Sequence, residues 1–263
     1  MPKFLLVIIL VLMSFGLHAQ TWEIGGFGGG AGYMGDLNQN NPLKVSGVSW
    51  GAFIKRNFDG YLAARVSYMY GNIAGADSTL SNLQQRQRNL SFRTQISELS
   101  LTAEFNFMKY IPSMSHDIYT PYIYVGLGYT NFNPQAMYQG QLYSLQSIMT
   151  EGQSKPYSNE AFSIPYGAGF KYNFAGALTI AADIGYRNPN TDYLDDVSGN
   201  YADKTKITDP VTLALSDRSG EKTGVYLGTA GTQRGDLRKR DTYMFIGFSI
   251  SYTFITSKCY YER

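Results

Sequence analysis

Short segments in which apolar residues alternate with small or polar residues recur along this chain, and this pattern constrains its fold most. In one segment Phe162 and Ile164 share a face, while Ser163 and Gly167 lie on the other. Successive side chains of a β-strand point to opposite faces, so each segment predicts a strand with one apolar face. The clear cases span residues 48–55, 62–70, 98–107, 123–130, 162–173, 178–187 and 244–254.

An eighth candidate strand, residues 22–34, is so rich in glycine that its facing is ambiguous. The segments run for about ten residues, which is the length a tilted strand needs to cross a bilayer. Eight strands also satisfy the even number found in single-chain bacterial barrels. We therefore predict an all-β chain that forms an eight-stranded antiparallel transmembrane β-barrel in the outer membrane, surrounded by outer-membrane lipids.

A soluble β-sandwich is the alternative, because its strands also alternate. Its polar faces would lie in water and should carry many charges, yet charged residues make up only 16% of this chain, against about 25% in typical domains. Aromatic residues reach 15%, with 22 Tyr and 28 Gly. The composition therefore favours the barrel, and aromatic residues at strand ends predict interfacial girdles. The girdle candidates are Trp22, Tyr110, Tyr172, Tyr186 and Tyr243.

The connections between the predicted strands alternate in length. Tight turns are expected at 57–60 and 173–176, and an intermediate link at 109–120. In outer-membrane barrels short turns face the periplasm and long loops face outward, which predicts extracellular loops and periplasmic termini. The long loops are expected at about 35–47, 74–91, 134–160 and 188–241.

The first residues have the pattern of a secretory signal peptide. Lys3 precedes an apolar stretch, residues 4–17, and Ala19 offers a small residue for cleavage. An uncleaved anchor is the alternative, but a membrane helix needs about 20 apolar residues. We expect a signal peptide at 1–19 and one barrel domain at 20–263. Cys259 is the single cysteine, so no internal disulfide can form.

Seven charged residues fall on the faces predicted to point into the barrel. An eight-stranded barrel is just wide enough for side chains to fill it, and buried charges are costly unless they are paired. A paired network that plugs the barrel is therefore favoured over a pore that conducts ions. The predicted interior charges are Lys55, Arg65, Glu98, Glu104, Lys171, Asp183 and Arg187.

No enzymatic, cofactor or metal site is predicted. After signal removal only His116 remains as a histidine, and no Gly-x-Ser-x-Gly sequence occurs. Asp192, Asp195 and Asp196 do not match the alternating ladder of a calcium loop and are expected to shape a turn. The Arg-Gly-Asp tripeptide at 234–236 is too short to be informative. The net charge of +2 without a basic cluster argues against a nucleic-acid partner.

Several motifs, in this order along the chain, resemble the PorG family of outer-membrane barrels, which are components of the type IX secretion system. They are 88–93 (RNLSFR), 104–107 (EFNF), 120–126 (TPYIYVG), 133–134 (NP), 150–153 (TEGQ), 164–171 (IPYGAGFK), 192–198 (DYLDDVS) and 233–236 (QRGD).

The resemblance implies a non-catalytic role in protein secretion, in which the barrel holds a periplasmic ring at the outer membrane. The implied partners are a PorK-like lipoprotein and a PorN-like protein. Such contacts need the periplasmic end, where the candidate docking residues are Phe58, Asp59, His116, Tyr260 and Tyr261. The alternative is a stand-alone barrel, which acts through its surface loops like an adhesin or as a narrow channel.

Overall fold

The computed structural model describes residues 21–112, 115–236, 238 and 240–254. The expected signal peptide, Cys259, Tyr260 and Tyr261 lie outside these residues. Among the described residues, no helix is long and apolar enough to cross a bilayer. The strands are β1 (Thr21–Met34), β2 (Val45–Asn57), β3 (Leu62–Ala76), β4 (Ser91–Asn106), β5 (Tyr119–Tyr138), β6 (Gln141–Ser144), β7 (Glu160–Ala175), β8 (Leu178–Pro189) and β9 (Thr242–Phe254).

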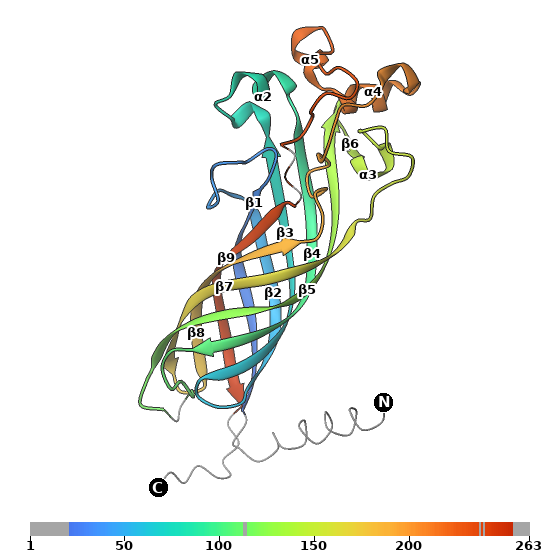
Figure 1. The fold of residues 1–263 in the computed structure, drawn as a ribbon. Coiled ribbons are helices and arrows are strands. Elements are labelled where there is room, and N and C mark those ends of the chain that lie inside the picture. The colour runs from blue at the N-terminus through green and yellow to red at the C-terminus, as the bar shows by residue number, and fades with distance from the viewer. Residues whose placement is uncertain (1–20, 113–114, 237, 239, 255–263) are drawn as a thin grey trace, which may run out of the picture.

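Eight of these strands close into one antiparallel barrel (Figure 1). Along the wall the order is β4, β3, β2, β1, β9, β8, β7, β5, and a pairing between β4 and β5 completes the circle. The prediction of a closed eight-stranded antiparallel barrel is confirmed. The ninth strand, β6, pairs only with the upper end of β5 as a hairpin and takes no part in the closure.

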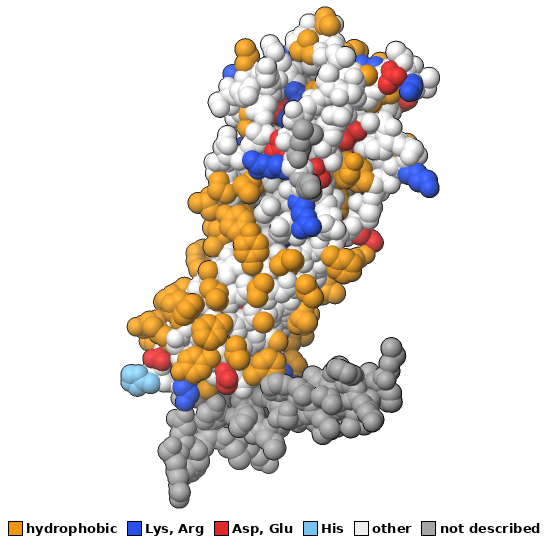
Figure 2. All heavy atoms as spheres, viewed as in Figure 1, with side chains coloured by type: hydrophobic (Ala, Val, Ile, Leu, Met, Phe, Trp, Pro, Cys, Tyr) orange, Lys and Arg blue, Asp and Glu red, His pale blue; other side chains and the backbone are white. Residues whose placement is uncertain are grey.

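The outer surface of the barrel is a belt of exposed apolar side chains, to which every barrel strand contributes (Figure 2). An apolar surface this continuous is not stable in water, so it belongs in lipid. We call it the apolar belt. It includes Trp22, Ile24, Val48, Trp50, Ile54, Val66, Leu99, Leu101, Val125, Leu127, Phe162, Ile164, Ile180, Phe248 and Ile250.

Several strands are longer than a bilayer requires. β5 has 20 residues and β4 has 16, whereas about 9–11 suffice to span. Their surplus rises beyond the apolar belt at one end of the barrel, where all four long connections lie (Figure 1). These connections are residues 35–44, 77–90, 139–159 and 190–241, within a few residues of the predicted loop boundaries.

The long connections fold into an ordered cap, which we define as those four segments together. Its buried apolar core includes Leu37, Leu90, Leu194, Val197 and Leu215, packed on the upper barrel strands. The cap contains the short helices η1 (Asp77–Thr79), α2 (Leu83–Arg88), α3 (Leu145–Ile148), η2 (Lys204–Lys206), α4 (Pro210–Ser216) and α5 (Ser219–Thr223).

Two of the predicted girdle residues are buried instead. Tyr243 is 1% exposed and points into the barrel. It lies an odd number of positions from the outward-facing Phe248 on the same strand, so its side chain is on the opposite face. Tyr110 follows β4, and its hydroxyl group forms a hydrogen bond of 2.7 Å with the Thr179 hydroxyl. Both use their hydroxyl groups inside the protein, so the girdle assignment is wrong for these two.

Candidate functional site

The lumen near the short turns holds an ion-pair network centred on one carboxylate. Glu104 lies 2.7 Å from Lys171 Nζ, 3.2 Å from an Arg65 guanidinium nitrogen and 3.7 Å from Lys55 Nζ. Lys55 also pairs with Glu23 at 2.7 Å. The five side chains come from β1, β2, β3, β4 and β7, so the network joins strands across the whole interior. All are nearly excluded from solvent.

A second layer lies closer to the cap. The Arg187 Nε atom is 3.3 Å from a Glu98 carboxylate oxygen, and the Tyr243 hydroxyl donates to that oxygen at 2.6 Å. The Arg187 guanidinium also covers the ring of Phe245, 4.6 Å from its centre. This layer ties β4, β8 and β9 together, and it fills the lumen with both charge and aromatic surface.

Asp183 is buried, but its hydrogen bond comes from a tyrosine. The Tyr122 hydroxyl donates to the Asp183 carboxylate at 3.1 Å, and no ion pair of Asp183 is found among the described residues. Glycines on the inner face make room for the tyrosines. A Cβ atom at Gly185 would clash with the Tyr124 hydroxyl, and one at Gly169 would lie 2.7 Å from the Tyr122 ring.

Sequence reasoning missed Glu23, Tyr122 and Tyr243 as partners in the lumen. Glu23 belongs to the glycine-rich first strand, whose facing the sequence leaves open; in the structure Trp22 and Ile24 point outward and Glu23 inward. The alternation of Trp22, Glu23 and Ile24 is the sequence signal that could have found it, since two apolar residues that flank a charge place that charge on the opposite, inward face.

Four motif segments that are far apart in the sequence meet in the cap. Arg234 pairs with Glu151 at 3.1 Å, donates to the Asp196 carbonyl at 2.8 Å and lies 3.7 Å from the Asp196 carboxylate. Arg88 pairs with Asp77 at 2.6 Å and donates to the Arg234 carbonyl at 2.5 Å. We call Asp77, Arg88, Glu151, Asp196 and Arg234 the arginine cluster. Because Arg234 is 3% exposed, its Arg-Gly-Asp sequence is not a surface ligand.

Four carboxylates, three of them buried and that of Asp192 half-buried, gather beside the arginine cluster. Oxygen atoms of Asp36, Asp192 and Asp241 lie within 4.8 Å of one another, and Asp195 accepts a hydrogen bond from Tyr33. We call these four aspartates the carboxylate cluster. As the sequence predicts for Asp195, its side chain shapes a turn, accepting from the Val197 N–H at 2.9 Å.

The carboxylate cluster holds protons that free aspartates lose. Burial and the nearby Asp236 carboxylate raise the pKa of Asp36 to about 7. Burial also raises the pKa of Asp192 to about 6. Burial and neighbouring carboxylates raise the pKa values of Asp195 and Asp241 well above their ordinary range. Each group takes up a proton more readily in the folded cap than in the unfolded cap.

The cap should therefore loosen as the pH rises. Raised carboxylate pKa values stabilise the cap fully below an unfolded aspartate pKa of about 4, and this stabilisation is lost as the pH passes through 6 to 7 and above. We expect Asp241→Asn to weaken this dependence, since an amide stays neutral and its oxygen still accepts from Leu194 N–H. Limited proteolysis of the cap between pH 5 and pH 9, values chosen around the pKa of about 7, measures it.

In that experiment the cleavage rate of the wild-type cap should rise by about tenfold from the low to the high pH, because a pKa shift of one unit changes an equilibrium constant by that factor. Asp117→Asn, at the opposite end of the barrel, should behave like wild type. Equal acceleration in Asp241→Asn and wild type would show that the carboxylate cluster does not set the pH response.

The candidate docking residues that the structure describes, Phe58, Asp59 and His116, lie at the short-turn end and have different roles. Asp59 accepts from the backbone N–H groups of Tyr61 and Leu62, both at 2.7 Å, so its carboxylate shapes the turn. Phe58 is half-buried in the same turn, and His116 is exposed in the link between β4 and β5. His116 is the single histidine among the described residues, and it stands at the opposite end from the cap.

Residues 2–209 match a family described as a domain of unknown function, DUF6089. The match covers well over half of the chain. The chain belongs to the DUF6089 family. The arginine cluster of this DUF6089 chain draws Arg88, Glu151 and Asp196 from the matched segment and Arg234 from beyond it. None of the curated proteins matches the sequence.

Among solved structures, this DUF6089 chain is similar to several small barrels. The N-terminal barrel domain of Pseudomonas aeruginosa OprF shares 13% identity at a TM-score of 0.39, covering 89% of this chain and 97% of that one. Neisserial surface protein A shares 9% identity at a TM-score of 0.45, and the match covers 90% of this chain and 98% of that one. A major outer membrane protein of Thermus thermophilus shares 12% identity at a TM-score of 0.41, and the match covers 90% of this chain and 100% of that one. These likenesses are too distant to bear on function.

Proposed function

We propose that this protein is a non-catalytic outer-membrane barrel that holds periplasmic proteins of a secretion machine at the membrane. The main support is the filled lumen, in which Glu104 pairs with three cationic side chains and Glu98 pairs with Arg187. These side chains occupy the space that a channel would need for water. A barrel filled in this way acts through its outer surfaces. The resemblance of its motifs to the PorG family of the type IX secretion system suggests the machine.

In this proposal the cap faces outward and the short turns face the periplasm, as in other outer-membrane barrels. The partners are a PorK-like lipoprotein and a PorN-like protein. Phe58 and His116 are the described side chains we expect at the contact, because Asp59 is engaged within its own turn. A surface adhesin is the second candidate, and the ordered cap with its apolar core favours it.

Affinity capture tests the proposal. A tag inserted at Gly140, in the exposed turn between β5 and β6, leaves the short-turn end untouched. After mild cross-linking of outer membranes, we expect a ring lipoprotein to be recovered in fixed proportion to the barrel. A Phe58→Ser, His116→Ser double variant should reduce that recovery severalfold. Leu83→Ser, an apolar-to-polar change at an exposed position of the cap, is the control.

Recovery of the barrel alone, even after cross-linking, would overturn the secretion role. Loss of the partner in Leu83→Ser but not in the double variant would move the contact to the cap and favour the adhesin.

A further inference from the structure

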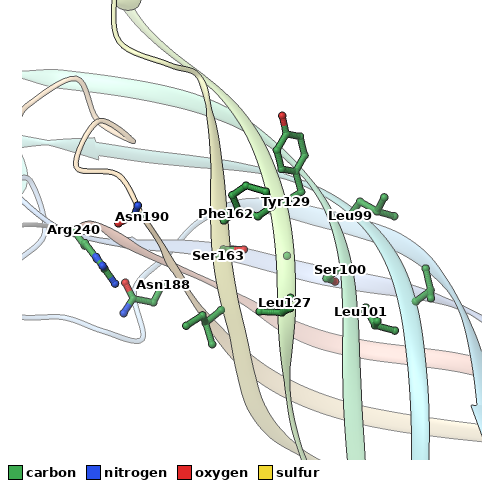
Figure 3. Close-up of a pocket in the computed structure, with 13 residues that line it drawn as sticks. Leu99, Ser100, Leu101, Leu127, Tyr129, Phe162, Ser163, Asn188, Asn190 and Arg240 are labelled. Atoms are coloured by element: carbon green, nitrogen blue, oxygen red, sulfur yellow. The ribbon is translucent and has the colours of Figure 1, made fainter. Parts of the chain in front are cut away.

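A groove opens in the outer face of the barrel wall across β4, β5, β7 and β8 (Figure 3). Its volume is about 500 Å³, within the range of about 300–1,000 Å³ of small-molecule sites. Leu101, Leu127 and Ile164 of the apolar belt line it. Ser100 and Ser163, which face the barrel interior, also line it. The groove therefore cuts into the wall and is deeper than the ordinary relief of the belt.

The strand pairing lapses beside the groove, next to its lining residues Leu127 and Ile164. Within the described strands, β5 and β7 pair at Val125–Tyr166 and again at Gly128–Ser163 in the same register, with no pair between them. Pro165 lies in this interval and has no N–H to donate to the ladder. The missing hydrogen bond leaves the two strands less tightly joined there, which explains why a recess forms at this point of an otherwise continuous wall.

The end of the groove nearer the cap is polar. Arg240, Asn188 and Asn190 gather there, while leucine side chains occupy the other end (Figure 3). The Asn188 Oδ1 atom is buried without a hydrogen-bond partner. Arg240 is exposed, and it forms no ion pair with any residue that the structure describes. The groove is thus amphiphilic, with one uncompensated positive charge at the edge of the apolar belt.

We propose that this groove binds one acyl chain of a membrane lipid and that Arg240 binds the phosphate of its headgroup. The apolar part opens directly onto hydrocarbon, so an acyl chain is the molecule that reaches it. The cation stands at the boundary where headgroups begin, and a guanidinium matches phosphate oxygens in charge and geometry. Asn188 and Asn190 add amide groups that bind polar headgroup atoms. The site is independent of the proposed secretion role.

Native mass spectrometry of the full chain released from nanodiscs tests the site. The nanodiscs contain phosphatidylcholine with a minor fraction of phosphatidylglycerol, so a neutral and an anionic headgroup compete. We expect wild type to retain phosphatidylglycerol preferentially. Arg240→Ala should lower its retention about two- to fivefold, the value of one partly exposed charge pair. Leu127→Trp should fill the groove and abolish retention of both lipids.

Two variants control for general effects of charge and bulk. Arg238→Ala removes a nearby cation that already pairs with Asp236 at 3.0 Å, and Val48→Trp adds the same ring to the belt on β2. Both should retain lipid like wild type. Equal retention of the two lipids by wild type, or unchanged retention in Arg240→Ala and Leu127→Trp, would overturn the proposal. Folding of each variant is checked by the heat-dependent mobility of the barrel in electrophoresis.

Discussion

Glu104→Gln should destabilise the barrel by about 3–5 kcal/mol, the cost of removing one partner from a buried ion pair. The change keeps the shape of the side chain but leaves Lys55, Arg65 and Lys171 with one carboxylate fewer. Glu23 alone then remains to pair with Lys55. Repulsion among three buried cations in a narrow lumen adds to the loss.

Urea unfolding from lipid vesicles measures this effect. Trp22 and Trp50 are the two tryptophans of the chain, and both point into lipid, so their fluorescence reports insertion. Glu160→Gln, at an exposed position of β7, is the matched control and should shift stability by less than about 0.5 kcal/mol. A shift below about 1 kcal/mol for Glu104→Gln would mean that water enters the lumen and solvates these charges.

Arg234→Ala should unfold the cap while the barrel stays intact. The change removes the buried cation between Glu151 and Asp196 and leaves both carboxylates without it. Breaking such a buried pair costs about 3–5 kcal/mol. The barrel strands are held by their own hydrogen-bonded ladders, which Arg234 does not join, so the cap should lose its protection while the barrel strands keep theirs.

Hydrogen exchange of backbone amides resolves the two regions. We expect fast exchange in residues 145–159 and 190–236 of Arg234→Ala, and unchanged exchange in β2 and β8. Lys206→Ala is the control, because its ion pair with Asp203 is at the surface, with Lys206 81% exposed. Slow exchange in the cap of Arg234→Ala would show that its apolar core, not the arginine cluster, holds it together.

Periodicity alone predicts the barrel because lipid on one side and a packed lumen on the other impose it on every strand. The facing of Lys55, Glu98 and Lys171 follows directly from that rule. The rule fails at Glu23, where glycines dilute the alternation. Glycine has no side chain whose polarity could mark a face.

The arginine cluster could not be predicted, since its partners are remote in sequence. Arg234 and Glu151 are 83 positions apart, and Arg234 and Asp196 are 38 apart. No local pattern encodes such a contact, so the Arg-Gly-Asp tripeptide carries no sign that its arginine is buried. The members of the carboxylate cluster are also far apart in the sequence, since Asp36 precedes β2 and Asp241 lies next to β9. Closure of the barrel brings these segments together.

Conductance of the purified barrel in planar lipid bilayers tests most directly that the lumen is closed and that the protein acts through its surfaces. With wild type we expect a quiet baseline without discrete current steps at moderate voltage, since Glu104, Lys55 and Lys171 fill the lumen with paired charges. Stable unitary steps whose ion selectivity changes in Lys171→Gln would contradict the account and make the protein a channel.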